Sequence, residues 1–190
     1  MRYLILILYF LPLCLNAQNT DNNVCSYETD GKEKSSGLKL RIKHPCLWIV
    51  KDGDRPGIVK KFIGDSSQTI MLSIRKIPSN INSAEIKRMV KIAGMKEALE
   101  EQTIINLREI IIDKTPAGEA IFTHESERSV GKMYIKSLSY FLVYKFYYIK
   151  IEYTVGGLSN TKEMLNRIFD RFEFTFKSLV NQTMILSQYE

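Results

Sequence analysis

The chain has 190 residues, of which 45% are hydrophobic and 25% are charged. Disordered chains are poorer in large apolar residues, and coiled coils lack the ten tyrosines and nine phenylalanines present here, so the composition indicates a globular protein. Lysine and arginine outnumber aspartate and glutamate by 27 to 21, and this net charge of +6 is spread along the chain. At about 100–200 residues per domain, the length accommodates one domain and a short appendage.

The appendage has the features of an export signal. Arg2 precedes an apolar run that reaches Leu15, and the small residue Ala17 follows it. A secretory signal peptide has such a basic start, an apolar stretch of about 7–15 residues and a small residue at the cleavage site. We therefore expect residues 1–17 to be a signal peptide that is cleaved between Ala17 and Gln18. The mature protein is then periplasmic or extracellular, with no transmembrane segment.

The three cysteines have different expected roles. Cys14 lies inside the apolar run and offers an alternative, a lipoprotein acylated at this residue; Leu13 before it is larger than lipobox chemistry prefers. Export leaves Cys25 and Cys46, an even number in an oxidising compartment, which predicts a disulfide. The alternative is one tethered and one buried free thiol. Without a Cys-x-x-Cys motif, a thioredoxin-like redox site is disfavoured.

The mature chain begins with a polar stretch and continues with strands. Residues 18–37 are rich in Asn, Asp, Ser, Gly and Lys, which predicts a flexible polar linker, so the globular domain is expected to span residues 38–190. From Leu38 to Lys43 apolar and basic residues alternate strictly, as they do in a strand with one buried face. Further strands are predicted over Cys46–Lys51, Ile58–Ile63, Gln68–Ile77, Ile104–Asp113, Glu119–Thr123 and Thr183–Leu186.

Two stretches have helical periodicity and one long stretch has the composition of a hairpin. Asn82 and Asn160 each precede a glutamate by three residues, which is typical of a capping box at a helix start. Gly94 is expected to divide the first helical region in two, the second helix covering Met95–Gln102. The second region has the apolar stripe of a single helix: Leu165, Ile168, Phe169, Phe172, Phe176 and Leu179. Lys132–Val155 is too long for one strand, so we expect a hairpin turn near Tyr144-Lys145. One face of this hairpin is expected to be buried, and the opposite face is half polar. The buried face contains Leu138, Tyr140, Leu142, Tyr147, Ile149, Ile151 and Tyr153, and the half-polar face contains Ser137, Ser139, Lys150 and Glu152 beside Phe141 and Phe146.

The order of elements predicts an α+β fold with an antiparallel sheet of about six or more strands flanked by helices. Several residues within it are spaced in a recognisable pattern: Pro45, Trp48, Arg55, Pro56, Phe62, Gly118 and Phe176. Over about Leu38–Leu186 this pattern resembles the PsbP-like domain superfamily. The resemblance implies an α/β/α sandwich that binds proteins, with fold-positioning rather than catalytic residues. Members of the superfamily include a photosystem II accessory subunit, a Ran-binding import factor, envelope lipoproteins and secretion-effector chaperones.

Catalytic and metal motifs are weak in this sequence. His124, Glu125 and Glu127 offer an acid–base pair or a metal site, but ordinary charges at a solvated strand end or hairpin rim explain them better. There is no Gly-x-Ser-x-Gly, no His-Glu-x-x-His and no phosphate-binding loop, so we expect no enzymatic activity and no cofactor or metal. Basic residues offer a surface for an anionic partner or, more simply, solubility and protection of a sheet edge: Lys39, Arg41, Lys43, Lys60, Lys61, Arg75 and Lys76.

Three functions follow from these observations. The first is an exported, non-catalytic PsbP-like domain that binds a protein partner of the cell envelope or assists an envelope complex. The second is a small-molecule or lipid carrier with a cavity between sheet and helices. The third is a hydrolase centred on His124 and Glu125. Nucleic acid is not an expected partner of an exported chain, and we expect a monomer or weak oligomer.

Overall fold

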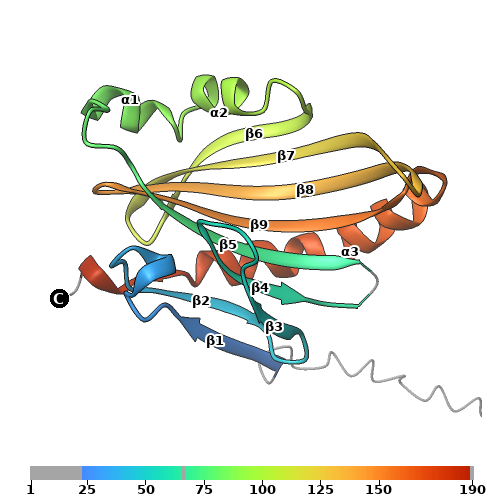
Figure 1. The fold of residues 1–190 in the computed structure, drawn as a ribbon, viewed down its shortest axis with the longest axis horizontal. Helices are drawn as coiled ribbons and strands as arrows, with labels where there is room; N and C mark the ends of the chain where they lie inside the picture. The colour runs from blue at the N-terminus through green and yellow to red at the C-terminus, as the bar shows by residue number, and fades with distance from the viewer. Residues whose placement is uncertain (1–22, 66, 189–190) are drawn as a thin grey trace, which may run out of the picture.

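The structure is a computed structural model, which describes residues 23–65 and 67–188. Its strands form two antiparallel sheets (Figure 1), a seven-stranded sheet in the order β3-β4-β5-β9-β8-β7-β6 and a three-stranded sheet in the order β1-β2-β10. The strands are β1 (Val24–Glu28), β2 (Leu40–Pro45), β3 (Ile49–Asp52), β4 (Ile58–Ile63), β5 (Gln68–Lys76), β6 (Thr103–Ile112), β7 (Thr115–Arg128), β8 (Gly131–Tyr144), β9 (Tyr147–Leu158) and β10 (Met184–Ile185). The helices are α1 (Ser83–Arg88), α2 (Ile92–Ala98) and α3 (Lys162–Asn181), with 3-10 turns η2 (Glu33–Ser35), η3 (Ser159–Thr161) and η4 (Leu186–Gln188).

Alternation along the strands decides which face of the large sheet is buried. Ile70, Leu72 and Ile74 on β5 are at most 1% exposed, whereas Met71 and Ser73 between them point to the other face. The predicted hairpin is also confirmed, because β8 and β9 pair from Met133 and Leu158 to Tyr144 and Tyr147 around a two-residue turn. Its buried face has the composition that the sequence predicts: Leu138, Tyr140, Leu142, Ile149, Ile151 and Tyr153.

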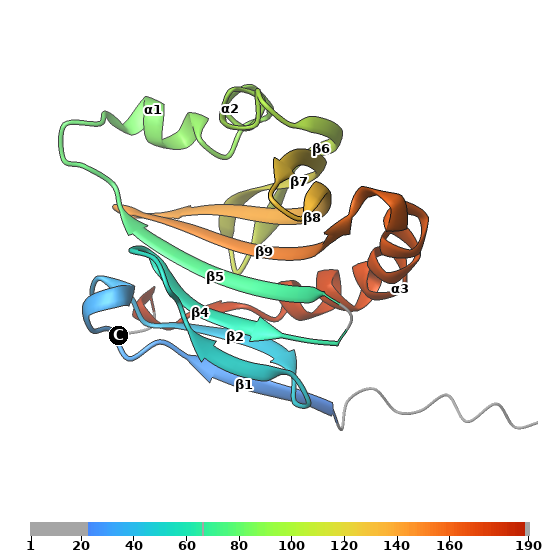
Figure 2. The same cartoon turned by 45° about the vertical axis from the view of Figure 1, so that its right-hand side comes forward.

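Helix α3 and the small sheet cover this buried face. Phe169 and Phe176 of α3 are fully buried, and their rings lie 5.2 and 5.5 Å from the ring of Tyr153. The small sheet closes the rest of the face, where Tyr27 of β1 meets Phe62 of β4 edge to face with ring centroids 5.9 Å apart. Figure 2 shows β1 and β2 below β4, with α3 beside them. The helical interpretation of the aromatic stripe is therefore confirmed.

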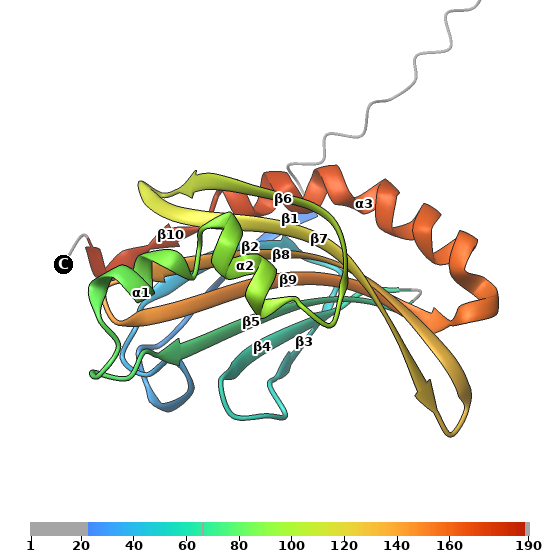
Figure 3. The same cartoon turned by 90° about the horizontal axis from the view of Figure 1, so that it is seen from above.

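Helices α1 and α2 lie on the opposite face, where α2 contacts β6 and β7. Figure 3 shows the two short helices in front of the large sheet and α3 at its far side. Met95 of α2 rests on Gly118 of β7, where a Cβ atom would collide with the methionine sulfur. A second apolar cluster forms here, including Val90, Phe122 and Phe141. The sheet is thus sandwiched between helices, as the α+β prediction requires.

The N-terminal region differs from the prediction. The predicted signal peptide, its cleavage site at Ala17–Gln18 and Cys14 lie outside the described residues. The flexible-linker prediction for residues 18–37 is wrong for residues 24–28, because these form β1 and pair with β2 from Val24 opposite Pro45 to Glu28 opposite Arg41. Composition misleads here because the strand is held mainly by pairing with β2, and of its side chains Tyr27 packs against the core.

The helix starts also differ in part. The capping box at Asn82 is confirmed: its side chain accepts hydrogen bonds from the amides of Ala84 and Glu85. The predicted division into two short helices is confirmed, but its position at Gly94 and the range Met95–Gln102 are wrong. Helix α2 already begins at Ile92, and the glycine lies within it, where a Cβ would collide with the carbonyl oxygen of Arg88. A tight approach between consecutive helices, rather than a helix end, requires this glycine.

The second predicted capping box, at Asn160, is wrong as well. The 3-10 turn η3 precedes α3 and shifts the N-cap position to Thr161, which makes no side-chain capping bond to α3. The Thr161 hydroxyl instead donates to the carbonyl oxygen of Leu158, 2.7 Å away. Within residues 23–188, apart from residue 66, no helix is long and apolar enough to cross a membrane.

Candidate functional site

His124 and Glu125 do not form a reaction centre. They are neighbours on β7, and adjacent strand residues point to opposite faces of a sheet. The Glu125 carboxylate pairs with Lys132 at 2.5 Å and with Lys162 at 3.6 Å. The hydrogen bond from Lys132 lowers the pKa of Glu125, whereas a general base working near neutrality needs a raised one. Across the described ranges 23–65 and 67–188, no three His, Cys, Asp or Glu residues are grouped to hold a metal ion.

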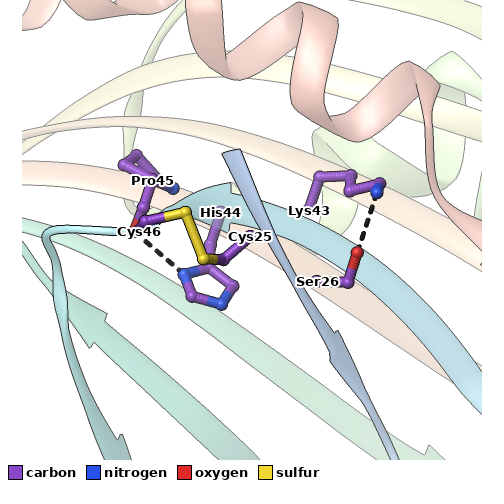
Figure 4. The surroundings of a disulfide bond; sticks show 6 residues. All are labelled: Cys25, Ser26, Lys43, His44, Pro45 and Cys46. Carbon is purple, nitrogen blue, oxygen red and sulfur yellow. Dashed lines mark hydrogen bonds between the residues drawn. A yellow bond between two sulfur atoms is a disulfide. The ribbon is translucent and has the colours of Figure 1, made fainter. Parts of the chain in front are cut away.

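The disulfide between Cys25 and Cys46 is present, which confirms the predicted pairing. Cys25 lies on β1 and Cys46 directly follows β2, and their Cα atoms are 4.8 Å apart. Beside it, the Lys43 ammonium donates to the Ser26 hydroxyl at 2.8 Å across the same strand pair (Figure 4). The disulfide therefore links β1, which buries little apolar surface, to its neighbour β2 in the small sheet.

The second histidine, His44, is part of this anchor. Its side chain is buried, its ring stacks on Phe62 with centroids 4.4 Å apart, and Nδ1 lies 3.0 Å from the carbonyl oxygen of Pro45. Burial lowers the pKa of His44, against a smaller opposing effect of the backbone hydrogen bond. A neutral, stacked imidazole next to the disulfide packs the small sheet onto the large one.

The predicted basic surface does not form as a unit. Arg41 pairs with Glu28 at 2.6 Å, Lys61 pairs with Asp54 at 2.7 Å, and Lys60 contacts Asp52. Strand β2 lies between β1 and β10, so its basic residues do not protect a sheet edge, and that interpretation is wrong. Of the predicted cations, Arg75 alone contributes to the cleft described next.

A cleft of about 360 Å³ lies on the face of the large sheet that α2 leaves uncovered. Its floor is formed by side chains of β5 and β9 that point away from the core, including Met71, Ser73 and Tyr148. Its walls come from the end of α2 on one side and from the turn before β4 on the other, where Arg55 and Pro56 lie. The sequence signal for this site was the half-polar second face of the predicted hairpin.

The cleft has an excess of positive charge. Arg55, Arg75 and Lys150 line it against a single carboxylate, that of Glu152. Glu152 is already bound by Lys150 and accepts a hydrogen bond from the Ser139 hydroxyl at 2.5 Å. Among the residues that the structure describes, no carboxylate lies within ion-pair distance of either arginine. Two guanidinium groups are thus free to bind an anionic group.

Aromatic side chains provide the apolar part of the cleft. The rings of Tyr148 and Phe141 stack with their centroids 6.2 Å apart, and both line the cleft. Burial raises the pKa of the Tyr148 hydroxyl, and Arg75 nearby opposes this in part, so the hydroxyl stays protonated at neutral pH and can donate a hydrogen bond. The site therefore offers flat apolar contact beside hydrogen-bond donors and cations, which suits recognition more than catalysis.

The core-facing side of the large sheet contains a buried carboxylate that the sequence analysis did not predict. Glu119 of β7 is 1% exposed and receives hydrogen bonds from Arg108 at 2.6 and 2.8 Å and from the Tyr140 hydroxyl at 2.6 Å. Burial acts to raise the pKa of Glu119, but the hydrogen bonds from Arg108 and Tyr140 outweigh it and the pKa is lowered. A fully bonded, ionised carboxylate under α3 ties β6, β7 and β8 together and is structural.

The seven residues that carry the family resemblance separate into two groups. Trp48 stacks on Phe172 of α3 with centroids 4.9 Å apart, and Phe62, Gly118 and Phe176 are buried at packing contacts. Pro45 ends β2. Arg55 and Pro56, by contrast, are exposed and line the cleft, so the structure places them at the candidate site as well as in the fold.

No protein-family model and no curated protein sequence matches this chain. The solved structures that resemble it include cyanobacterial PsbP (CyanoP) from Synechocystis sp. PCC 6803, at 14% identity and a TM-score of 0.53, and LpqN, involved in cell envelope biogenesis of Mycobacterium tuberculosis, at 10% identity and a TM-score of 0.50. Each comparison covers 86% of this chain and 92% of the other. Together with the seven-stranded antiparallel sheet between helices, these likenesses show that the chain has the fold of a PsbP-like domain.

Proposed function

We propose that this chain is an exported, non-catalytic domain that binds a protein partner of the cell envelope, or assists an envelope complex, through the cationic cleft. The observation that carries the proposal is a pair of arginines beside aromatic rings: Arg55 and Arg75 have no carboxylate partner among residues 23–65 and 67–188, and they line the cleft together with Phe141 and Tyr148. Arginine and aromatic side chains are enriched in protein interfaces, because both give large contact area and directed hydrogen bonds. An enzyme would need acid, base or nucleophilic groups that converge on one site. The candidate pair, His124 and Glu125, instead points to opposite faces of the sheet.

The partner that fits this cleft is an extended acidic segment of a protein. A guanidinium group binds a carboxylate through two parallel hydrogen bonds, so two arginines can hold two acidic side chains. The rings of Phe141 and Tyr148 would contact an apolar side chain between them. A cleft of about 360 Å³ accommodates a few residues of such a segment rather than a folded domain.

Two observations support a location outside the cytoplasm. Disulfides persist in oxidising compartments and are rare in the cytosol, and Cys25 is bonded to Cys46. The structural neighbour LpqN takes part in envelope biogenesis in its own organism. The predicted signal peptide at residues 1–17 agrees with both.

The proposal is tested by site-specific crosslinking. The photoreactive residue p-benzoylphenylalanine replaces Met71 on the cleft floor in one variant, and Phe174, 82% exposed on α3, in a control. Each is expressed with its signal in the source organism, and cells are irradiated before adducts are identified by mass spectrometry. We expect a discrete protein adduct from position 71 that disappears when Arg75→Glu is added and persists with exposed Arg167→Glu. Adducts that are equal at both positions, or insensitive to Arg75→Glu, would contradict the proposal.

A further inference from the structure

A second pocket, of about 640 Å³, lies at the end of the large sheet where α1 faces the turn between β8 and β9. Its lining is mainly apolar and comes from three separate parts of the chain. Ile86 and Val90 belong to α1 and the turn after it, Pro116 lies at the start of β7, and Val143 and Phe146 lie at the end of β8 and in its turn. This pocket shares no lining residue with the cationic cleft.

Phe146 is the most unusual residue of the lining. It occupies the two-residue turn between β8 and β9, where glycine, asparagine or aspartate is usual, and its side chain is 60% exposed. The turn is nevertheless held in place, because the carbonyl oxygen of Phe146 accepts a hydrogen bond from the amide of Ile77 at 2.7 Å. A large and mostly exposed ring is therefore held at the mouth of an apolar pocket, although apolar surface in water is unfavourable.

The rim of this pocket is cationic. Lys87, Lys91 and Lys145 line it, and no acidic residue does. Lys91 is paired with Glu109 at 2.6 Å, and Lys145 lies over the ring of Tyr144. In the described part of the chain, no carboxylate is within ion-pair distance of Lys87 or Lys145. Two ammonium groups at the mouth thus remain free for an anion.

We propose that this pocket binds a free long-chain fatty acid, with its alkyl chain against Ile86, Val143 and Phe146 and its carboxylate at Lys87 and Lys145. An apolar floor with a few placed polar groups is the usual composition of a small-molecule site, and the volume lies within the usual range of about 300–1,000 Å³. An inorganic anion would leave the floor unused, and a neutral apolar ligand would leave the lysines unused. A carboxylate with an alkyl chain uses both.

This proposal is independent of the protein-binding function and is tested separately. Sodium dodecanoate, below its micellar concentration, is titrated into the signal-cleaved protein, residues 18–190, by isothermal calorimetry. We expect saturable binding with one ligand per chain. The variant carrying Lys87→Glu and Lys145→Glu should bind about tenfold more weakly or worse, the loss expected when a charge-assisted hydrogen bond is removed. The control Lys51→Glu, on exposed β3, changes one charge away from the pocket and should bind like the wild type.

Tryptophan fluorescence at the pocket mouth tests whether the ligand binds in this pocket. Phe146→Trp places an indole at the pocket mouth, whereas the chain's only tryptophan, Trp48, packs on α3. Dodecanoate should shift the emission of the variant to shorter wavelength and leave that of the wild type unchanged. Dodecyltrimethylammonium, with the same chain and the opposite charge, and hexanoate, with the same headgroup and a short chain, should each bind much more weakly.

Three results would overturn the proposal. One is an absence of dodecanoate binding, and another is binding that the double lysine variant leaves unchanged. The third is binding to vesicles of anionic phosphatidylglycerol without binding of monomeric dodecanoate, which would make this end of the sheet a membrane-docking face. Because circular dichroism should be identical for all these surface variants, a loss of binding with a native spectrum reports on the pocket alone.

Discussion

Three phenylalanines on α3 allow a graded test of the core. Phe176 is 1% exposed and lies between Tyr140 and Tyr153, with ring centroids 5.7 and 5.5 Å away. Phe172 is half-buried against Trp48. Phe174 belongs to the same helix but is 82% exposed. The three Phe→Ala substitutions change helix propensity equally, so their differences report burial.

The expected magnitudes follow from this burial. Removing a fully buried phenylalanine costs the transfer free energy of the ring and the free energy of the cavity left behind, about 3–5 kcal/mol together. Phe176→Ala should therefore lower the free energy of unfolding by about 4 kcal/mol, and Phe172→Ala by about 2 kcal/mol because part of its ring is already in water. Phe174→Ala should change it by no more than about 0.5 kcal/mol.

Urea unfolding of the oxidised, signal-cleaved protein measures these differences. Far-ultraviolet circular dichroism is the better probe, since the fluorescence of Trp48 depends directly on Phe172. In a domain of this size the Phe176→Ala change corresponds to a fall in melting temperature of about 8–16 °C. If Phe176→Ala proved no more destabilising than Phe174→Ala, the assignment of the buried helix face would be wrong.

Four further outcomes are expected. Free-thiol labelling of the native, unreduced protein should find neither Cys25 nor Cys46 reactive, and replacing both by serine should cost about 3 kcal/mol, measured by urea unfolding. Glu119→Gln should be less stable than the wild type at pH 7 by about 1–3 kcal/mol. Because the folded-state pKa of Glu119 lies below its ordinary value of 4.5, that difference should be constant above this pH and shrink as the pH falls below it, as unfolding curves across pH would show. His124→Ala should shift unfolding by about 0.5 kcal/mol or less. Mass spectrometry of the exported protein should find Gln18 at its N-terminus, and a diacylated cysteine there would contradict the cleavage prediction.

Local periodicity was enough to predict most of the elements. The strict alternation of Leu38–Lys43, the capping box at Asn82 and the apolar stripe from Leu165 to Leu179 depend on residues close in sequence. A strand or helix with one buried face repeats its apolar residues with a fixed period, whatever the rest of the chain does. The hairpin at Lys145 followed from length alone, since its turn lacks the usual turn residues.

Part of the candidate site could also be predicted from the sequence. The half-polar face of the predicted hairpin contains Lys150 and Glu152, which line the cationic cleft. From the sequence, Arg55 was identified only among the residues of the family resemblance, and Arg75 only as one of several basic residues. No local pattern predicts that these four side chains meet, because β5 and β9 become neighbours only through long-range pairing.

The sequence by itself thus determined the α+β class, the buried faces of Leu38–Lys43, of the β8–β9 hairpin and of α3, and the disulfide pairing. Only the tertiary structure decided that residues 24–28 form a strand, that Glu119 is buried beside Arg108, and which part of the large sheet stays uncovered. The physical reason is that β1 depends on hydrogen bonds to β2, and that an ionised buried carboxylate is tolerated only where donors from other strands reach it. These partners lie on other strands, 11 residues away for Arg108 and 21 for Tyr140, so the periodicity within one element does not encode them.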